Sequence, residues 1–207
     1  MYGNTSISSN NTVQRKILNC ENNGDITANT SAGGICGLKT IGTVAIISNS
    51  INRGAVSATA YSGGIFGSVY DNGTGEGKLE IEYCYNVGEV KHEESIIVSG
   101  GIIGYIDGKS TVKNSYSIGL IANGTNCAGV AGSNAGTITR CYYLENSATK
   151  LYGVNSGTID SSLNSSKTEG QLKEDDMITT LNEGASTAVW KKDENNINNG
   201  YPILSWQ

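Results

Sequence analysis

A five-residue pattern that recurs four times is the feature that most limits how this chain can fold. Each copy combines closely spaced glycines with an aliphatic third residue. The copies span residues 33–37, 63–67, 100–104 and 128–132. A second pattern that ends in glycine precedes each copy, at residues 20–24, 50–54, 84–88 and 115–119. The fixed order of the two patterns defines four repeats of about 30 residues each, and repeats of this length are typical of solenoids.

The segments between the glycines have the composition of short β-strands. They are rich in Ile, Val, Thr and Tyr, and Gly or Asn residues bound them. In the second repeat they are residues 44–51, 55–60 and 64–69. A single triplet of such strands cannot bury its own apolar face, whereas stacked triplets cover one another. The sequence therefore predicts an all-β fold, a three-sided parallel β-helix with coils of about 30 residues, and parallel crossovers favour a right-handed one.

Stacking aligns equivalent residues of successive coils into columns, and three columns have predicted roles. A β-branched interior ladder is formed by Ile35, Ile65, Ile102 and Val130. The neighbouring column is Cys36, Phe66, Ile103 and Ala131. A ladder of side-chain amide hydrogen bonds is expected along Asn22, Asn52 and Asn86. The glycines that follow at these corners, expected to have positive φ, are Gly24, Gly54, Gly88 and Gly119.

The five cysteines fit the repeat better than they fit a metal or redox site. Their number is odd and no CxxC pair occurs. Cys20, Cys84 and Cys141 share one column, in which Ser50 and Ser115 occupy the intervening coils. A disulfide within the column requires adjacent coils, so free buried thiols are favoured over disulfides.

The glycine pattern ends near residue 167, which divides the chain into three parts. Residues 1–16 are a polar N-terminal edge, residues 17–166 form the solenoid, and residues 167–207 form a C-terminal cap. Helical spacing of apolar residues predicts a short helix over residues 169–182. An apolar tail with Trp190 and Trp206 follows. We expect this helix and an aromatic strand to cover the open end of the solenoid, because such ends expose apolar core and unpaired edges.

Charge and hydropathy exclude two classes of partner. Charged residues make up 16% of the chain, the net charge is -5, and no Lys/Arg cluster occurs, which argues against nucleic-acid binding. No apolar run approaches the roughly 20 residues that span a bilayer, so no membrane insertion is expected. No secretory signal is visible. We expect the chain to be part of a longer multidomain protein.

Two insertions lengthen turns of the third coil, and loops of this kind are where solenoids bind ligands. They are residues 70–78 and 91–97. The candidate ligand-binding residues are Tyr70, Asp71, Asn72, His92, Glu93 and Glu94. One histidine with two adjacent acids is too few ligands for zinc, and the acidic loop lacks the calcium-loop spacing. We therefore predict no metal and no cofactor.

An enzymatic alternative depends on three carboxylates. Parallel β-helix lyases and hydrolases act through carboxylates clustered on one outer face. Glu80 and Glu82 share a strand face here, and Glu89 lies one corner further on. A solvated outer face is the simpler interpretation of the three.

Tyrosine is far commoner than phenylalanine, with 11 residues against one. Six of them cluster in the middle and late coils: Tyr83, Tyr85, Tyr105, Tyr116, Tyr142 and Tyr143. Such side chains either pack inward or line corners, or lie on an exposed face and stack against sugars or a protein partner.

With its repeats aligned, the sequence resembles the GLUG-repeat family. The resemblance depends on residues 33–37, 63–67 and 100–104, on residues 84–88, and on the closing segment 199–206. It covers about residues 17–206, and Ala128 and Ser117 depart from the pattern. The resemblance implies a β-solenoid from bacterial surface or secreted proteins, including adhesins and non-catalytic parts of immunoglobulin A peptidases. It implies no shared enzymatic residues.

These observations predict a non-catalytic extracellular or cell-surface module of a bacterial protein that acts as an adhesin or structural spacer. Its expected partners are surface glycans or host or bacterial surface proteins. The alternative is a carbohydrate-active β-helix enzyme or its carbohydrate-binding appendage.

Overall fold

The computed structural model describes residues 14–39, 44–69, 77–92, 98–122 and 124–207, apart from the side chain of His92. The first coil contains β1 (Gln14–Leu18), β2 (Glu21–Asn22), β3 (Ile26–Ala28), β4 (Ser31–Gly33) and β5 (Cys36–Lys39). The second contains β6 (Val44–Ser48), β7 (Ile51–Asn52), β8 (Val56–Ala58), β9 (Tyr61–Gly63) and β10 (Phe66–Val69). The third contains β11 (Lys78–Glu82), β12 (Tyr85–Asn86), β13 (Val90–His92), β14 (Val98–Gly100) and β15 (Ile103–Ile106).

The later coils are shorter. The fourth contains β16 (Thr111–Ser117), β17 (Asn126–Ala128) and β18 (Ala131–Asn134). A contracted end follows, with β19 (Thr137–Leu144), a 3-10 turn η1 (Glu145–Ser147), β20 (Tyr152–Asn155), β21 (Thr158–Ile159) and β22 (Ser165–Lys167). The C-terminal segment contains α1 (Glu169–Lys173), α2 (Asp175–Asn182), β23 (Trp190–Lys191) and β24 (Ile203–Leu204).

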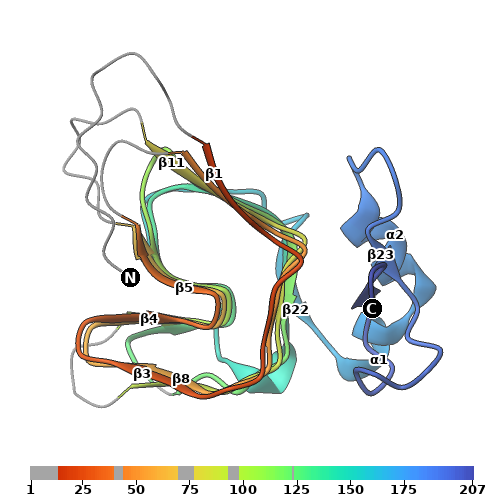
Figure 1. The fold of residues 1–207 in the computed structure, drawn as a ribbon, viewed down its shortest axis with the longest axis horizontal. Helices are drawn as coiled ribbons and strands as arrows, with labels where there is room; N and C mark the ends of the chain where they lie inside the picture. The colour runs from red at the N-terminus through yellow and green to blue at the C-terminus, as the bar shows by residue number, and fades with distance from the viewer. Residues whose placement is uncertain (1–13, 40–43, 70–76, 93–97, 123) are drawn as a thin grey trace.

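The coils stack as a parallel β-helix, which confirms the predicted fold class (Figure 1). Strands of one coil pair in parallel with the equivalent strands of the next. From the red N-terminal coil to the green coils behind it, the chain turns clockwise in Figure 1, which is a right-handed winding. The cross-section of the solenoid has more sides than the three expected. Each full coil contributes five strands to four parallel sheets.

The longest sheet joins two of these strands per coil and is bent between them. One residue at the bend has φ between 51° and 55° in every coil: Asn19, Asn49, Tyr83, Asn114 and Arg140. The residue after each bend is a cysteine or serine, and its side chain stabilises the corner. The Ser50 hydroxyl, for example, accepts a hydrogen bond from the backbone N–H of Cys20 and donates to the Ser48 carbonyl. A left-handed residue followed by Cys or Ser therefore forms the corner of each coil.

The prediction that the corner glycines have positive φ is wrong. In the described residues positive φ at glycine occurs at Gly184 and Gly200, in the C-terminal segment. The repeat glycines are required for space instead. A Cβ on Gly54 would lie 2.0 Å from the Gly24 carbonyl oxygen, and one on Gly88 would lie 1.9 Å from that of Gly54. These glycines stack so closely that the backbones of consecutive coils touch.

The Gly-Gly pattern turns the chain back on itself. A Cβ on Gly33 would lie 2.6 Å from the backbone nitrogen of Gly67, so the sheets that contain β4 and β5 meet backbone to backbone. A Cβ on Gly34 would lie 2.2 Å from the Asn52 side chain. The first glycine therefore lets two sheets touch, and the second fits over the asparagine ladder. This turn adds the extra side to each coil.

The predicted interior columns are confirmed. Ile65, Ile102 and Val130 are fully buried in the main core, and Ile35 packs partly buried against it. The amide of Asn22 donates to Asn52 over 2.7 Å, and the amide of Asn52 donates to Asn86 over 2.8 Å. The ladder ends on the hydroxyl of Ser117. Buried amides are thus satisfied from coil to coil.

The five cysteines are free, and in the column predicted to hold buried thiols two of the three are buried, whereas Cys20 is half-buried. Cys84 and Cys141 are fully buried. Burial raises the pKa of each of these thiols to about 12, which keeps both protonated at neutral pH.

The C-terminal segment, residues 168–207, is called the lateral unit below. Its predicted helix is present but interrupted at Glu174 into α1 and α2. A capping box between Thr168 and Gln171 begins α1. None of the described helices is long and apolar enough to cross a membrane.

The expected position of the lateral unit across the open end is wrong. It packs along the side of the stack, where Figure 1 shows it in blue beside β22. Leu172, Leu181 and Trp190 bury against the outward-facing tyrosines of the long sheet. The Asn114 amide also donates to the carbonyls of Leu181 and Glu183. The outer face of the middle coils is apolar, so it needs this cover more than the end does.

This packing decides the role of the tyrosines. Tyr83, Tyr85, Tyr116 and Tyr142 point outward and are buried beneath the lateral unit. Tyr143 packs inward in the main core, and Tyr105 is half-buried on another sheet beside Tyr61. Tyr83 lies at a corner, as one expected alternative allows, whereas Tyr85, Tyr116 and Tyr142 fit neither alternative, because they face outward but are covered by the chain itself.

Candidate functional site

A shallow groove lies at the junction of the lateral unit and the first two coils. Its volume is about 500 Å³. The solenoid contributes Glu21, Asn23 and Arg53 to its lining, and the lateral unit contributes Ile197, Trp206 and Gln207. The interior of the solenoid is filled by the side chains of the stacked strands, so the groove lies on the outside. We call it the lateral groove.

The column structure of the solenoid explains why the groove lies here. Glu21 aligns with Ile51 and Tyr85 in the following coils, so one outward column changes from polar to apolar. The column two residues further along the chain changes in the same way, from Asn23 and Arg53 to Val87 and Ile118, and the last two pack beneath the lateral unit. The groove therefore begins where the apolar face, and its cover, end.

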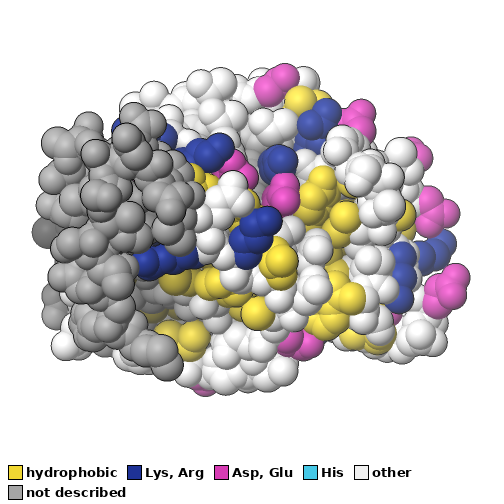
Figure 2. Space-filling view, turned by 45° about the horizontal axis from the view of Figure 1, so that its top comes forward, with side chains coloured by type: hydrophobic (Ala, Val, Ile, Leu, Met, Phe, Trp, Pro, Cys, Tyr) yellow, Lys and Arg dark blue, Asp and Glu magenta, His cyan; other side chains and the backbone are white. Residues whose placement is uncertain are grey.

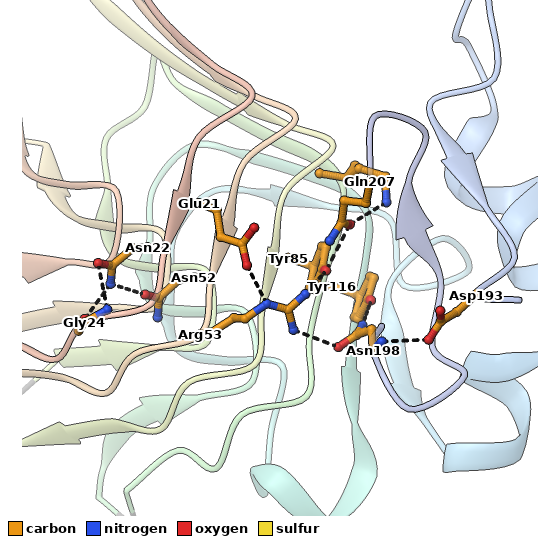
Figure 3. Close-up of polar contacts among 11 residues, drawn as sticks. Glu21, Asn22, Gly24, Asn52, Arg53, Tyr85, Tyr116, Asp193, Asn198 and Gln207 are labelled. Carbon is orange, nitrogen blue, oxygen red and sulfur yellow. Dashed lines mark hydrogen bonds and ion pairs between the residues drawn. The ribbon is translucent and has the colours of Figure 1, made fainter. Parts of the chain in front are cut away.

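Arg53 is the central side chain of the groove (Figure 3). Its Nε donates to Glu21 over 2.7 Å, and its Nη2 donates to the Tyr85 hydroxyl over 2.9 Å. Nη1 lies 3.5 Å from the Asn198 side-chain oxygen, and the guanidinium carbon lies 5.7 Å from the centre of the Tyr85 ring. Partial burial lowers the pKa of Arg53, but the hydrogen bond to Glu21 and the electrostatic effects of Glu21, Tyr85 and Tyr116 together outweigh it and leave the pKa raised.

Side chains of the lateral unit form further hydrogen bonds to the tyrosines beside Arg53. The Tyr85 hydroxyl donates to the Gln207 side-chain oxygen over 3.1 Å. The Asn198 amide donates to the Tyr116 hydroxyl. Burial raises the pKa of both tyrosines, so their hydroxyls stay protonated and able to donate.

Asp193 fixes the loop that carries Asn198. Its carboxylate accepts backbone N–H groups of Ile197, Asn198 and Gly200. Burial raises the pKa of Asp193, but these three hydrogen bonds and the nearby Arg53 outweigh it, and the pKa lies below its ordinary value. The carboxylate is therefore ionised at neutral pH.

Two apolar side chains of the groove remain exposed. Trp206 is 41% exposed and Ile197 is 39% exposed. The Trp206 indole donates through Nε1 to the Asn49 carbonyl over 3.0 Å. This bond anchors the edge of the ring to the second coil and fixes the orientation of the indole.

The sequence-predicted site residues fall outside, or at the edge of, the part of the chain that the structure describes. Tyr70, Asp71, Asn72, Glu93 and Glu94 lie outside the described residues. His92 is the last residue of β13, and its side chain also lies outside the described part.

The carboxylates of the enzymatic alternative are each paired with a lysine. Glu80 pairs with Lys78 over 2.5 Å, and Glu82 pairs with Lys113 over 2.9 Å. Glu89 pairs with Lys91 one sheet further on. Figure 2 shows acidic and basic side chains interspersed on one face of the molecule. Among the described residues no group of three or more His, Cys, Asp or Glu side chains could hold a metal ion.

Comparison with known proteins places the fold. No family model matches the chain, and no curated protein matches it. A crystal structure described as a "putative immunoglobulin A1 protease" from Bacteroides ovatus is similar, with a TM-score of 0.54 and 24% sequence identity. The match covers 93% of this chain but 58% of the Bacteroides chain. At this identity the likeness supports the β-solenoid fold alone.

Proposed function

We propose that the chain is a non-catalytic extracellular module that binds a surface ligand through the lateral groove, with the solenoid as a rigid spacer. The observation that carries the proposal is the groove itself, which presents a fixed, exposed Trp206 beside a fixed Arg53. Preorganised aromatic and polar groups of this kind favour binding, because little freedom is lost when a ligand arrives.

The absence of enzymatic function is part of the same proposal. Catalysis by carboxylates needs two of them free to contact one substrate. Glu80 and Glu82 point from neighbouring positions of one strand, and each is neutralised by its own lysine. The resemblance to GLUG repeats and the description of the Bacteroides protein both suggest a module of a larger secreted or surface-attached protein.

A panel of polysaccharides, immobilised host and bacterial surface proteins, and immunoglobulin A1 tests the proposal. Retained protein, released reducing ends and cleaved protein are measured on the same samples. We expect retention on at least one surface without cleavage. Cleavage of any member would contradict the proposal and would favour the enzymatic alternative.

A further inference from the structure

We propose that the lateral groove binds a neutral oligosaccharide. In this arrangement one sugar ring stacks on Trp206 while its hydroxyl groups bond to Glu21, Asn23 and Arg53. The inference rests on the proposed binding function and adds the chemical class of the ligand.

The aromatic part of the groove suits the apolar face of a sugar ring. Trp206 is held at its Nε1 edge by the Asn49 carbonyl, so its exposed surface is the ring and not the polar edge. Ile197 adds a second exposed apolar contact to the same groove. A pyranose ring has a face of C–H groups and a rim of hydroxyls, which matches an apolar platform with polar groups beside it.

The polar part of the groove offers donors and acceptors side by side. A guanidinium has five N–H donors, and Glu21, Tyr85 and Asn198 occupy three of those of Arg53. Glu21 uses one carboxylate oxygen in this network, which leaves the other as an acceptor. Asn23 is exposed and contributes both a donor and an acceptor. Hydroxyl groups both donate and accept, so a pair of neighbouring hydroxyls can use such a mixed set fully.

The charge of the groove decides between neutral and acidic ligands. The carboxylate of Glu21 lies 2.7 Å from Nε of Arg53 and neutralises it. The ionised Asp193 adds a second negative charge close enough to act on Arg53. One positive and two negative charges leave no net attraction for a carboxylate, sulfate or phosphate. A neutral sugar pays no such repulsion.

The test compares neutral oligosaccharides with uronic-acid oligosaccharides of the same length. Binding is measured by isothermal titration and by the fluorescence of Trp206, which is the exposed one of the two tryptophans. We expect at least one neutral oligosaccharide to bind more tightly than its acidic counterpart. Trp206→Ala should weaken that binding by about tenfold or more, as for other central aromatic contacts.

Glu21→Gln provides the sharper variant. It removes the charge that neutralises Arg53 and keeps the shape of the side chain. We therefore expect the affinity for acidic oligosaccharides to rise relative to the affinity for neutral ones. Glu80→Gln is the matched control, because it breaks the Lys78–Glu80 ion pair on another face and should change neither affinity.

Three results would overturn the inference: tighter binding of acidic than of neutral sugars by the unaltered protein, unchanged binding by Trp206→Ala, or no binding of any sugar. Retention on a protein surface together with no sugar binding would overturn this inference while the proposed binding function stands. Absence of retention on every surface would overturn both.

Discussion

The rings of Tyr85 and Tyr116 stack almost parallel, with centroids 5.2 Å apart and planes 5° apart, although they belong to different coils. Trp190 of the lateral unit packs against both rings, at 5.9 Å and 5.3 Å. Register between coils thus creates an aromatic surface, and the lateral unit is attached to that surface. The groove exists because the attachment stops one coil short of the N-terminal end.

Trp190→Ala should therefore weaken the attachment of the lateral unit. Truncation of a fully buried tryptophan costs about 3–5 kcal/mol. Trp206→Ala is the matched control, because Trp206 is exposed and should cost little stability. Urea unfolding followed by circular dichroism measures both variants. Equal unfolding midpoints for the two would contradict the packing described here.

The corner glycines provide a test of the spacing between coils. Gly54→Ala would place a Cβ 2.0 Å from the Gly24 carbonyl oxygen, so the coils must separate. Gly24→Ala changes the equivalent position of the first coil, where the nearest atom would be 3.9 Å away. We expect a cost of about 1–3 kcal/mol for Gly54→Ala from overpacking and close to zero for Gly24→Ala. Thermal melting of the two proteins checks this, and equal melting temperatures would refute it.

The asparagine ladder predicts that the loss of stability on substitution differs along the stack. Asn52 is fully buried and bonds to an amide on each side, whereas Asn22 begins the ladder and is half-buried. Asn52→Ala removes the donor to the buried Asn86 side-chain oxygen and to the Gly54 carbonyl, and each buried group left unsatisfied costs about 1–3 kcal/mol. Asn22→Ala should cost clearly less. Chemical denaturation of both variants measures the difference, and a larger cost at Asn22 would argue against the ladder.

Much of the fold was predictable because a repeat constrains every coil at once. The interior ladder of Ile65 and Ile102 and the amide ladder of Asn52 follow from spacing alone, since stacking must place equivalent residues together. The free cysteines followed from the same alignment.

Other features depend on distances that a sequence does not contain. Glycine at position 54 is compatible both with positive φ and with close approach of backbones, and only the position of the Gly24 carbonyl separates them. The left-handed bend residue varies in type between asparagine, tyrosine and arginine, which hides it. The side of the stack that the lateral unit covers depends on which column is apolar and faces outward.

One pattern in the sequence could have located the groove. The corner column changes from Asn23 and Arg53 to Val87 and Ile118, and this change marks the edge of the covered surface. The position of Trp206 could not be inferred, because residues 183–205 connect it to the solenoid through a path that no repeat constrains.

The buried thiols predict a loss of stability at alkaline pH. The pKa of Cys84 and of Cys141 is raised by burial from 9.0 to about 12, so the folded protein keeps two protons that the unfolded chain releases. Their stabilising effect is complete below pH 9 and is lost as the pH rises toward 12. Each thiol lowers the free energy of unfolding by at most about 1.4 kcal/mol per pH unit in this window.

The double variant Cys84→Ser, Cys141→Ser isolates this effect. Serine already occupies the same column at Ser50 and Ser115, where its hydroxyl satisfies the neighbouring backbone, so the variant should fold. Burial also raises the pKa of Tyr142 to about 12, and this contribution remains in both proteins. We expect the free energy of unfolding to fall less steeply between pH 9 and pH 11 in the variant than in the parent. Identical slopes, or rapid labelling of Cys84 by a thiol reagent in the native protein at pH 8, would show that the column is not buried as described.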